Sequence, residues 1–73
     1  MSGATFQVVK TGSNQFSIVL DYESKATTYA VLDIQGNTLA RGTFDGKQAT
    51  LARPGHGFYV IKVKQNLKMV NFR

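Results

Sequence analysis

The chain has 73 residues, no cysteine and a formal charge of +5, and 42% of its residues are hydrophobic. This length holds one core and one domain, and without cysteine neither disulfides nor a thiolate-bound metal can reinforce that core. The apolar runs are far shorter than the roughly 20 residues of a membrane-spanning helix, and residues 1–4 lack the basic and apolar regions of a signal peptide. We therefore expect one folded domain over 5–73, a tail or linker remnant over 1–4, and no transmembrane segment.

The positive charge is unevenly distributed along the sequence. Through Gly46, three basic residues face four acidic ones, whereas the last 27 residues carry six basic residues and no acid. Two interpretations stay open, namely solvated strand faces and edges or a docking surface for an acidic partner. In either case we expect the excess charge to lie along one edge, formed by the last hairpin.

The first half of the chain reads as strands joined by turn residues. Alternating apolar residues predict strands over 5–10 and 15–21, the second with a buried stripe of Phe16, Ile18 and Leu20. Residues 22–25 read as a connection. The segment 27–34, rich in Thr, Tyr, Val and Ile, predicts a central strand, and 38–44 pairs back onto it after a turn at Gly36.

The second half continues in the same way. Asp45-Gly46 is a common two-residue hairpin signal, so we expect the chain to reverse there into a short strand over 48–51. Residues 53–57 form a loop, because Pro54 lacks an amide hydrogen. The strongest strand is 58–64, followed by a turn at Gln65-Asn66 and a last strand over 67–72.

Alternation orients the strand over 58–64. Its residues Tyr59, Ile61 and Val63 share one face and should point to the core, with Lys62 and Lys64 in water. Six or seven short strands without helical periodicity indicate an antiparallel β-sandwich or a small barrel, and we favour the sandwich.

The inventory of reactive residues is small. His56 is the only histidine, and although Ser17, His56 and Asp33 could be drawn as a triad, no Gly-x-Ser-x-Gly turn supports it. No phosphate-binding glycine loop occurs. We expect no enzymatic activity, no catalytic residue, no metal and no cofactor.

A basic β-domain can also bind single-stranded nucleic acid through exposed aromatic residues. Phe58, close to Lys62 and Lys64, fits that pattern. The mode needs two or three exposed aromatics on adjacent strands, and the ribonucleoprotein-type motif is missing. We expect no nucleic-acid partner, and keep a nucleic-acid binder and an Ig-like adhesion or carbohydrate-binding module as alternative functions.

Two segments within 29–73 form a distinctive pair. In the first, an apolar strand runs into Asp33, two variable residues and Gly36; in the second, the strand Gly57-Phe58-Tyr59 is followed after a turn by a strand that begins at Lys68. Together they resemble the C-terminal sorting domains of type IX secretion in Bacteroidetes. Order and separation make the pair more specific than either motif alone. Two positions depart from the family pattern: the early Asn-Pro element of many type A members is absent, and Asn37 stands where the family often has a basic residue.

The resemblance implies an all-β fold, namely an Ig-like antiparallel β-sandwich of about seven short strands. It also implies that the domain acts as a C-terminal secretion signal. The family's folded domain is recognised by the outer-membrane type IX translocon and its shuttle protein. A surface sortase commonly removes it while attaching the cargo, which lies N-terminal in the parent protein, to anionic lipopolysaccharide. The implied location is the periplasm in transit, then the outer membrane or cell surface, or the medium.

The recognition positions carried over by this resemblance lie on the last hairpin, and we expect it to offer backbone hydrogen bonds and a basic rim to its partner, by strand addition. Purely structural explanations also stay open. Gly36 and Gly57 could be required only for their positive φ, and Tyr59 could be a core residue. Lys68 could lie at a solvated strand edge, and we find no packing reason for a lysine there. The candidate recognition residues are Gly57, Tyr59, Lys62, Lys64, Lys68, Val70, Phe72 and Arg73, and the turn residues are Asp33 and Gly36.

Overall fold

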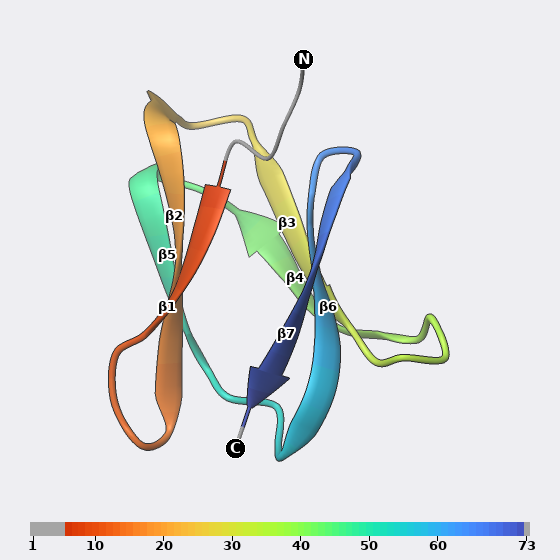
Figure 1. The fold of residues 1–73 in the computed structure, drawn as a ribbon. Coiled ribbons are helices and arrows are strands. Elements are labelled where there is room, and N and C mark those ends of the chain that lie inside the picture. The colour runs from red at the N-terminus through yellow and green to blue at the C-terminus, as the bar shows by residue number, and fades with distance from the viewer. Residues whose placement is uncertain (1–5, 73) are drawn as a thin grey trace.

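The computed structural model describes residues 6–72, which form seven strands in two antiparallel sheets packed face to face (Figure 1). The strands are β1 (Phe6–Lys10), β2 (Gln15–Ser24), β3 (Thr28–Leu32), β4 (Thr38–Thr43), β5 (Gly46–Ala52), β6 (Gly57–Val63) and β7 (Asn66–Phe72). One sheet has the order β1-β2-β5 and the other β4-β3-β6-β7. The expected seven-stranded β-sandwich is confirmed. Among the described residues, no helix is long and apolar enough to cross a membrane.

The core lies between the two sheets and is built by strand alternation. On β2, Phe16, Ile18 and Leu20 are buried while Asp21 is exposed, as the period of two requires. On β6, Ile61 and Val63 are fully buried, and Tyr59 packs against them from the same face. The buried hydrophobic residues are Phe6, Phe16, Ile18, Leu20, Val31, Phe44, Ile61, Val63 and Phe72.

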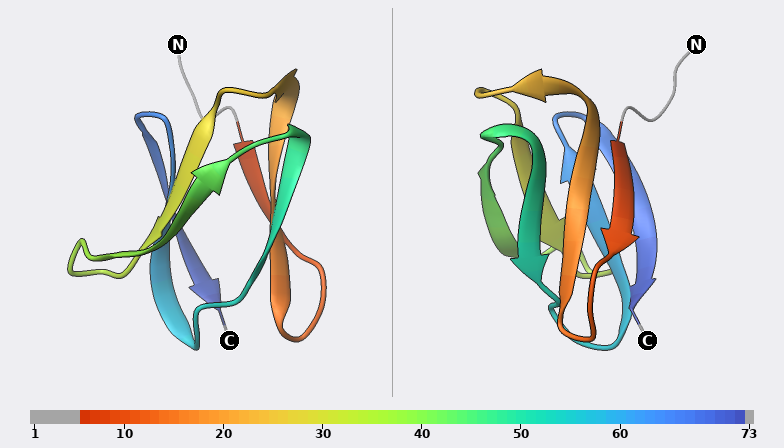
Figure 2. Two further views of the ribbon diagram at one scale, coloured as in Figure 1. Left: turned by 180° about the vertical axis from the view of Figure 1, so that it is seen from behind. Right: turned by 90° about the vertical axis from the view of Figure 1, so that its left-hand side faces the viewer.

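Strand β3 occupies the central position that its apolar sequence predicted, between β4 and β6. The sandwich therefore has two open edges. Strands β1 and β7 form one edge, which is turned toward the viewer in Figure 1. Strands β4 and β5 form the opposite edge, which is turned toward the viewer in the left view of Figure 2. The β3–β4 hairpin projects outward from the four-stranded sheet, beyond a register shift between Val31 and Leu32.

The expected reversal at Asp45-Gly46 is wrong, because β4 and β5 do not pair. Strand β4 pairs with β3, and β5 pairs with β2 in the other sheet, so the chain crosses between sheets here. Phe44, 1% exposed, anchors the crossing. Its amide donates to the Thr27 carbonyl at 2.8 Å, and its ring meets Tyr29 edge-on at a centroid distance of 5.2 Å. Burial of one aromatic residue therefore overrides a local turn signal.

Two smaller expectations also differ from the structure. Strand β2 continues through residues 22–24, where a connection was expected, and the turn begins at Ser24, whose hydroxyl accepts the amides of Ala26 and Thr27 at 3.1 and 3.0 Å. This is the local turn that Ser side chains stabilise. In the last hairpin the turn residues are Lys64 and Gln65 rather than Gln65 and Asn66.

Candidate functional site

The strands that carry the recognition candidates form one hairpin. Strands β6 and β7 pair along their whole length, from Gly57 opposite Phe72 to Val63 opposite Asn66. Gly57 begins β6 with a φ of 110°, a left-handed backbone conformation that glycine adopts without a steric penalty, so the positive-φ reading of this residue is confirmed. Arg73 lies outside the described residues.

Three recognition candidates hold the hairpin onto the core. The Phe72 ring is fully buried, with its centroid 4.9 Å from that of Phe16 and 6.0 Å from that of Tyr59. Tyr59 and Val70 are partly buried and pack against the same cluster. Their side chains therefore position the hairpin, and its partner-facing surface must come from the residues between them.

Lys68 lies on the core side of β7, in phase with Val70 and Phe72. Its Nζ donates to the carbonyl of Phe6 at 3.3 Å and lies 5.6 Å from the centroid of the Phe6 ring. At the other end of β1, Lys10 Nζ donates to the carbonyl of Asn71 at 2.7 Å. These two lysines connect β1 with β7 across the edge of the sandwich.

The expectation that Lys68 has no packing reason is therefore wrong. The signal that reveals it is the alternation itself: Lys68 shares its strand face with Val70 and Phe72, so it points inward at an edge where a long side chain can reach the opposite sheet. The same contacts bear on strand addition, since the Asn71 carbonyl of β7 already accepts a hydrogen bond from Lys10.

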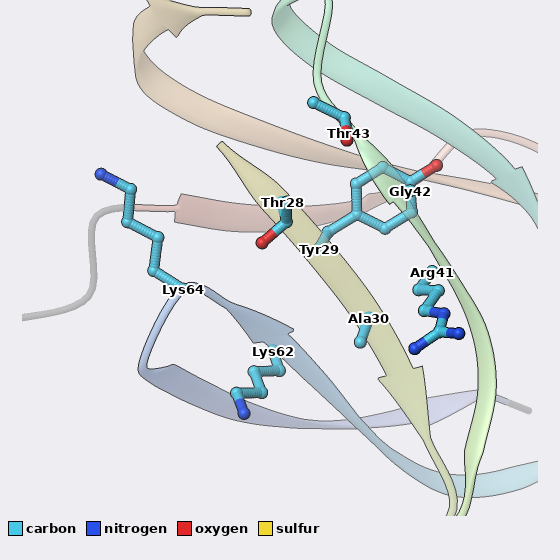
Figure 3. A pocket seen from close by; sticks show the side chains of 8 residues that line it. All are labelled: Thr28, Tyr29, Ala30, Arg41, Gly42, Thr43, Lys62 and Lys64. Atoms are coloured by element: carbon cyan, nitrogen blue, oxygen red, sulfur yellow. The ribbon is translucent and has the colours of Figure 1, made fainter. Parts of the chain in front are cut away.

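Lys62 lies on the outer face of the four-stranded sheet. Register places Ala30 of β3 between Arg41 of β4 and Lys62 of β6. Thr28 and Ala30 alternate with Tyr29 and Val31, which contact the core, so this row points away from it. The small Ala30 side chain leaves a hollow of about 450 Å³, also lined by Thr28, Thr43 and Lys64 (Figure 3).

The two cations beside Ala30 point away from the sheet on either side of it, whereas Lys64 extends in another direction (Figure 3). Lys64 adopts a positive φ of 56° at the hairpin turn, and its Nζ lies 6.0 Å from the centroid of the Tyr22 ring. Arg41 was not among the sequence-based candidates. Its place beside Ala30 follows from the register between β3 and β4, so it can be predicted only when that pairing is known.

The excess positive charge does not lie along one edge, and that expectation is wrong. Lys62 is on the outer face of the four-stranded sheet, Lys68 at the β1–β7 edge, and Lys47 on β5 of the other sheet. Arg53 lies in the β5–β6 connection, where its Nη2 and Nε donate to the carbonyls of Gly12 and Gln15 at 2.6 and 3.2 Å. Basic residues that follow one another in the sequence are thus divided among four parts of the fold.

The turn candidates Asp33 and Gly36 form a closed hydrogen-bonded turn. One carboxylate oxygen of Asp33 accepts the amides of Gln35 and Asn37, both at 2.9 Å, and the other accepts the Asn37 side chain at 3.1 Å. The backbone and side chain of Asn37, followed by the amides of Gln35 and Gly36, hold the pKa of Asp33 below its ordinary value. Gly36 has a φ of 94°, which confirms its turn role.

The residues from which a triad could be drawn have other partners. The Ser17 hydroxyl lies 2.8 Å from that of Thr50 and accepts from Gln48 Nε2 at 3.1 Å. Asp33 is engaged in its own turn, and His56 is exposed in the β5–β6 connection. Within residues 6–72, no three His, Asp or Glu side chains gather in a group that could hold a metal ion.

Comparison of the chain with known protein families, with curated proteins and with solved structures found no match.

Proposed function

We propose that this chain is a C-terminal sorting domain of the type IX secretion system. The observation that carries the proposal is the hairpin: the Gly57-x-Tyr59 strand and the strand containing Lys68 pair with each other over their full length. The Asp33-x-x-Gly36 turn joins the two other strands of the same sheet. The elements that resemble the family are thus parts of one sheet.

In this function the domain acts as an address that is read in its folded state. The outer-membrane translocon and its shuttle protein bind the domain in the periplasm and carry the parent protein outward, and a surface sortase then removes the domain. Tyr59, Val70 and Phe72 hold the hairpin in place from the core. Lys62 and the other outward side chains are the groups that remain for contact with the partner.

The test is transport of a reporter. A fluorescent or enzymatic reporter with a periplasmic signal peptide, fused at its C-terminus to the full 73-residue chain, is expressed in a Bacteroidetes host with an intact translocon and in a translocon-null strain. We expect the reporter at the surface or in the medium only in the intact strain. A folded fusion that stays in the periplasm of both strains would contradict the proposal.

A further inference from the structure

The outer face of the four-stranded sheet carries large apolar side chains that stay exposed. Phe58 on β6 is 54% exposed, and Leu67 and Met69 on β7 are each 64% exposed. Register places Val60 opposite Met69 and Lys62 opposite Leu67, so these side chains are neighbours on one face. A contiguous exposed apolar patch on a small domain marks an interaction surface.

The basic hollow adjoins this apolar patch. Lys62 belongs to both, since it lies between Leu67 of β7 and Ala30 of β3, and Arg41 lies across Ala30 from it. The four acidic residues of the chain lie elsewhere: Asp21 and Glu23 on β2, Asp33 in its turn and Asp45 in the β4–β5 crossing. The face therefore combines an apolar half with a positive half that no carboxylate of its own strands neutralises.

The outer face of the other sheet has a different character. Ser17, Gln48 and Thr50 form a neutral hydrogen-bonded row there. Its exposed apolar residue is Val9, on β1 opposite Ser17. This face supplies matched controls, because it belongs to the same domain and lies on the far side of the core.

We infer that the outer face of the four-stranded sheet, rather than the free edge of β7, is the surface that binds the protein partner. The partner presents carboxylate side chains to Arg41 and Lys62 beside an apolar ridge that covers Phe58, Leu67 and Met69. Charge complementarity favours this occupant, whereas a second copy of this +5 chain would place like charges together. The inference rests on the proposed function, since it assigns the surface that the transport machinery reads.

Two features favour a protein over a bilayer and the face over the edge. A side chain can enter the hollow of about 450 Å³ around Ala30, whereas a flat bilayer surface leaves it unfilled. At the β7 edge, Lys10 of β1 donates to Asn71 of β7 and Lys68 of β7 donates to Phe6 of β1, so an added strand would have to displace the Lys10 hydrogen bond to Asn71.

The experiment uses the reporter fusion in the intact host with two face variants and two matched controls. Lys62→Glu reverses a charge at the hollow and Phe58→Thr removes apolar area while keeping strand propensity. Lys25→Glu, in the exposed β2–β3 connection, and Val9→Thr, on the opposite face, make the same changes elsewhere. Thermal unfolding of the purified domains identifies any variant that is less folded than the wild type.

We expect surface reporter to fall by at least about tenfold for the two face variants, the change typical of side chains at the centre of an interface, and to stay at the wild-type level for the two controls. Equal export of all four folded variants alongside an exported wild type would overturn the inference and leave the proposed function standing. A wild-type fusion that is not exported would overturn the proposed function, and the inference with it.

A second measurement tests the bilayer as occupant. The purified domain is mixed with vesicles of equal parts phosphatidylcholine and phosphatidylglycerol and floated through a density gradient. We expect no co-flotation. Co-flotation that is lost in Lys62→Glu and Phe58→Thr but kept in Lys25→Glu and Val9→Thr would assign the face to a membrane and overturn the inference.

Discussion

Lys68 contributes to the edge of the sandwich through two contacts at once. Its ammonium group donates to the Phe6 carbonyl and lies over the Phe6 ring, so it connects β7 to β1 where no backbone pairing joins the two sheets. A charged hydrogen bond to a backbone carbonyl and a cation–π contact both strengthen when partly shielded from water, as they are at this half-buried position. The lysine of the terminal strand thus has a structural role beside any role in recognition.

Replacing Lys68 with alanine should therefore destabilise the fold. We expect the free energy of unfolding to fall by about 1–2 kcal/mol, from the loss of one hydrogen bond and one cation–π contact. Urea denaturation of the purified domain measures this value. Lys47→Ala, at an exposed position on β5, is the control, with an expected change within about 0.5 kcal/mol. Equal unfolding midpoints for the two variants would refute the structural role of Lys68.

Asp33 makes the free energy of unfolding depend on pH in the acidic range. Its pKa is lowered in the folded state, mainly by its hydrogen bonds with the Asn37 backbone and side chain. The carboxylate therefore stabilises the fold fully above its unfolded-state pKa of about 3.9, and that contribution is lost as pH falls through the lower folded-state pKa. Asp33→Asn removes this titration while keeping the shape of the side chain.

Unfolding curves of the wild type and Asp33→Asn between neutral pH and the acid limb measure the effect. We expect the stability difference between the two proteins to be largest at neutral pH and to shrink below pH of about 4. The two proteins are identical at every other position, so the difference isolates residue 33. A difference that is constant with pH would show that the Asp33 turn does not depend on its charge.

At the scale of elements, the last hairpin is held by one buried aromatic ring and exposes another. Phe72 on β7 contacts Phe16 of the opposite sheet, whereas Phe58 on β6 is 54% exposed. The pair therefore compares a buried and an exposed phenylalanine on one hairpin, where the side chains are the same and only their surroundings differ.

Truncating these two residues should destabilise the domain to different extents. Phe72→Ala removes a fully buried ring and should cost about 3–5 kcal/mol, a large share of the 5–15 kcal/mol typical of small domains. Phe58→Ala should cost no more than about 1 kcal/mol, since just over half of its surface stays exposed after folding. Chemical denaturation gives both values. Comparable losses in the two variants would mean that Phe58 is packed in solution.

The strands could be predicted from the sequence, but the pairings of β2 with β5 and of β3 with β6 could not. Alternation oriented Phe16, Ile18, Ile61 and Val63 correctly, because burial of one sheet face imposes a period of two, and composition located β3. The Asp45-Gly46 signal failed because turn propensity is local. Whether the chain reverses or crosses to the other sheet depends on the burial of Phe44 against Tyr29 and Thr27, which are distant in sequence.

The candidate site shows the same division. Alternation placed Tyr59 on the core side, but it was not used to orient Phe72, whose full burial is seen only in the structure. The row of Arg41, Ala30 and Lys62 depends on three paired strands and their register. The Lys68 bridge depends on which strand lies across the edge of the sandwich. Contacts between sheets are set by topology, which hydrophobic periodicity alone does not specify.

At the scale of the whole molecule, the two outer faces of the sandwich differ. The face over β1, β2 and β5 carries the neutral row of Ser17, Gln48 and Thr50, and the face over the four-stranded sheet carries apolar and basic groups. A +5 domain with this asymmetry should approach an acidic partner in a preferred orientation, and salt should weaken that attraction. The orientation in which the domain meets its partner therefore connects the fold to the proposed function as a sorting signal.

Site-specific photocrosslinking in the Bacteroidetes host tests this account most directly. A photoreactive amino acid replaces Thr28, which lines the hollow on the four-stranded face, or Gln48 on the opposite face of the exported reporter fusion. The account predicts a crosslink from position 28 to the outer-membrane shuttle protein and none from position 48. Equal crosslinking from both positions, or none from position 28 while the reporter still reaches the surface, would contradict it.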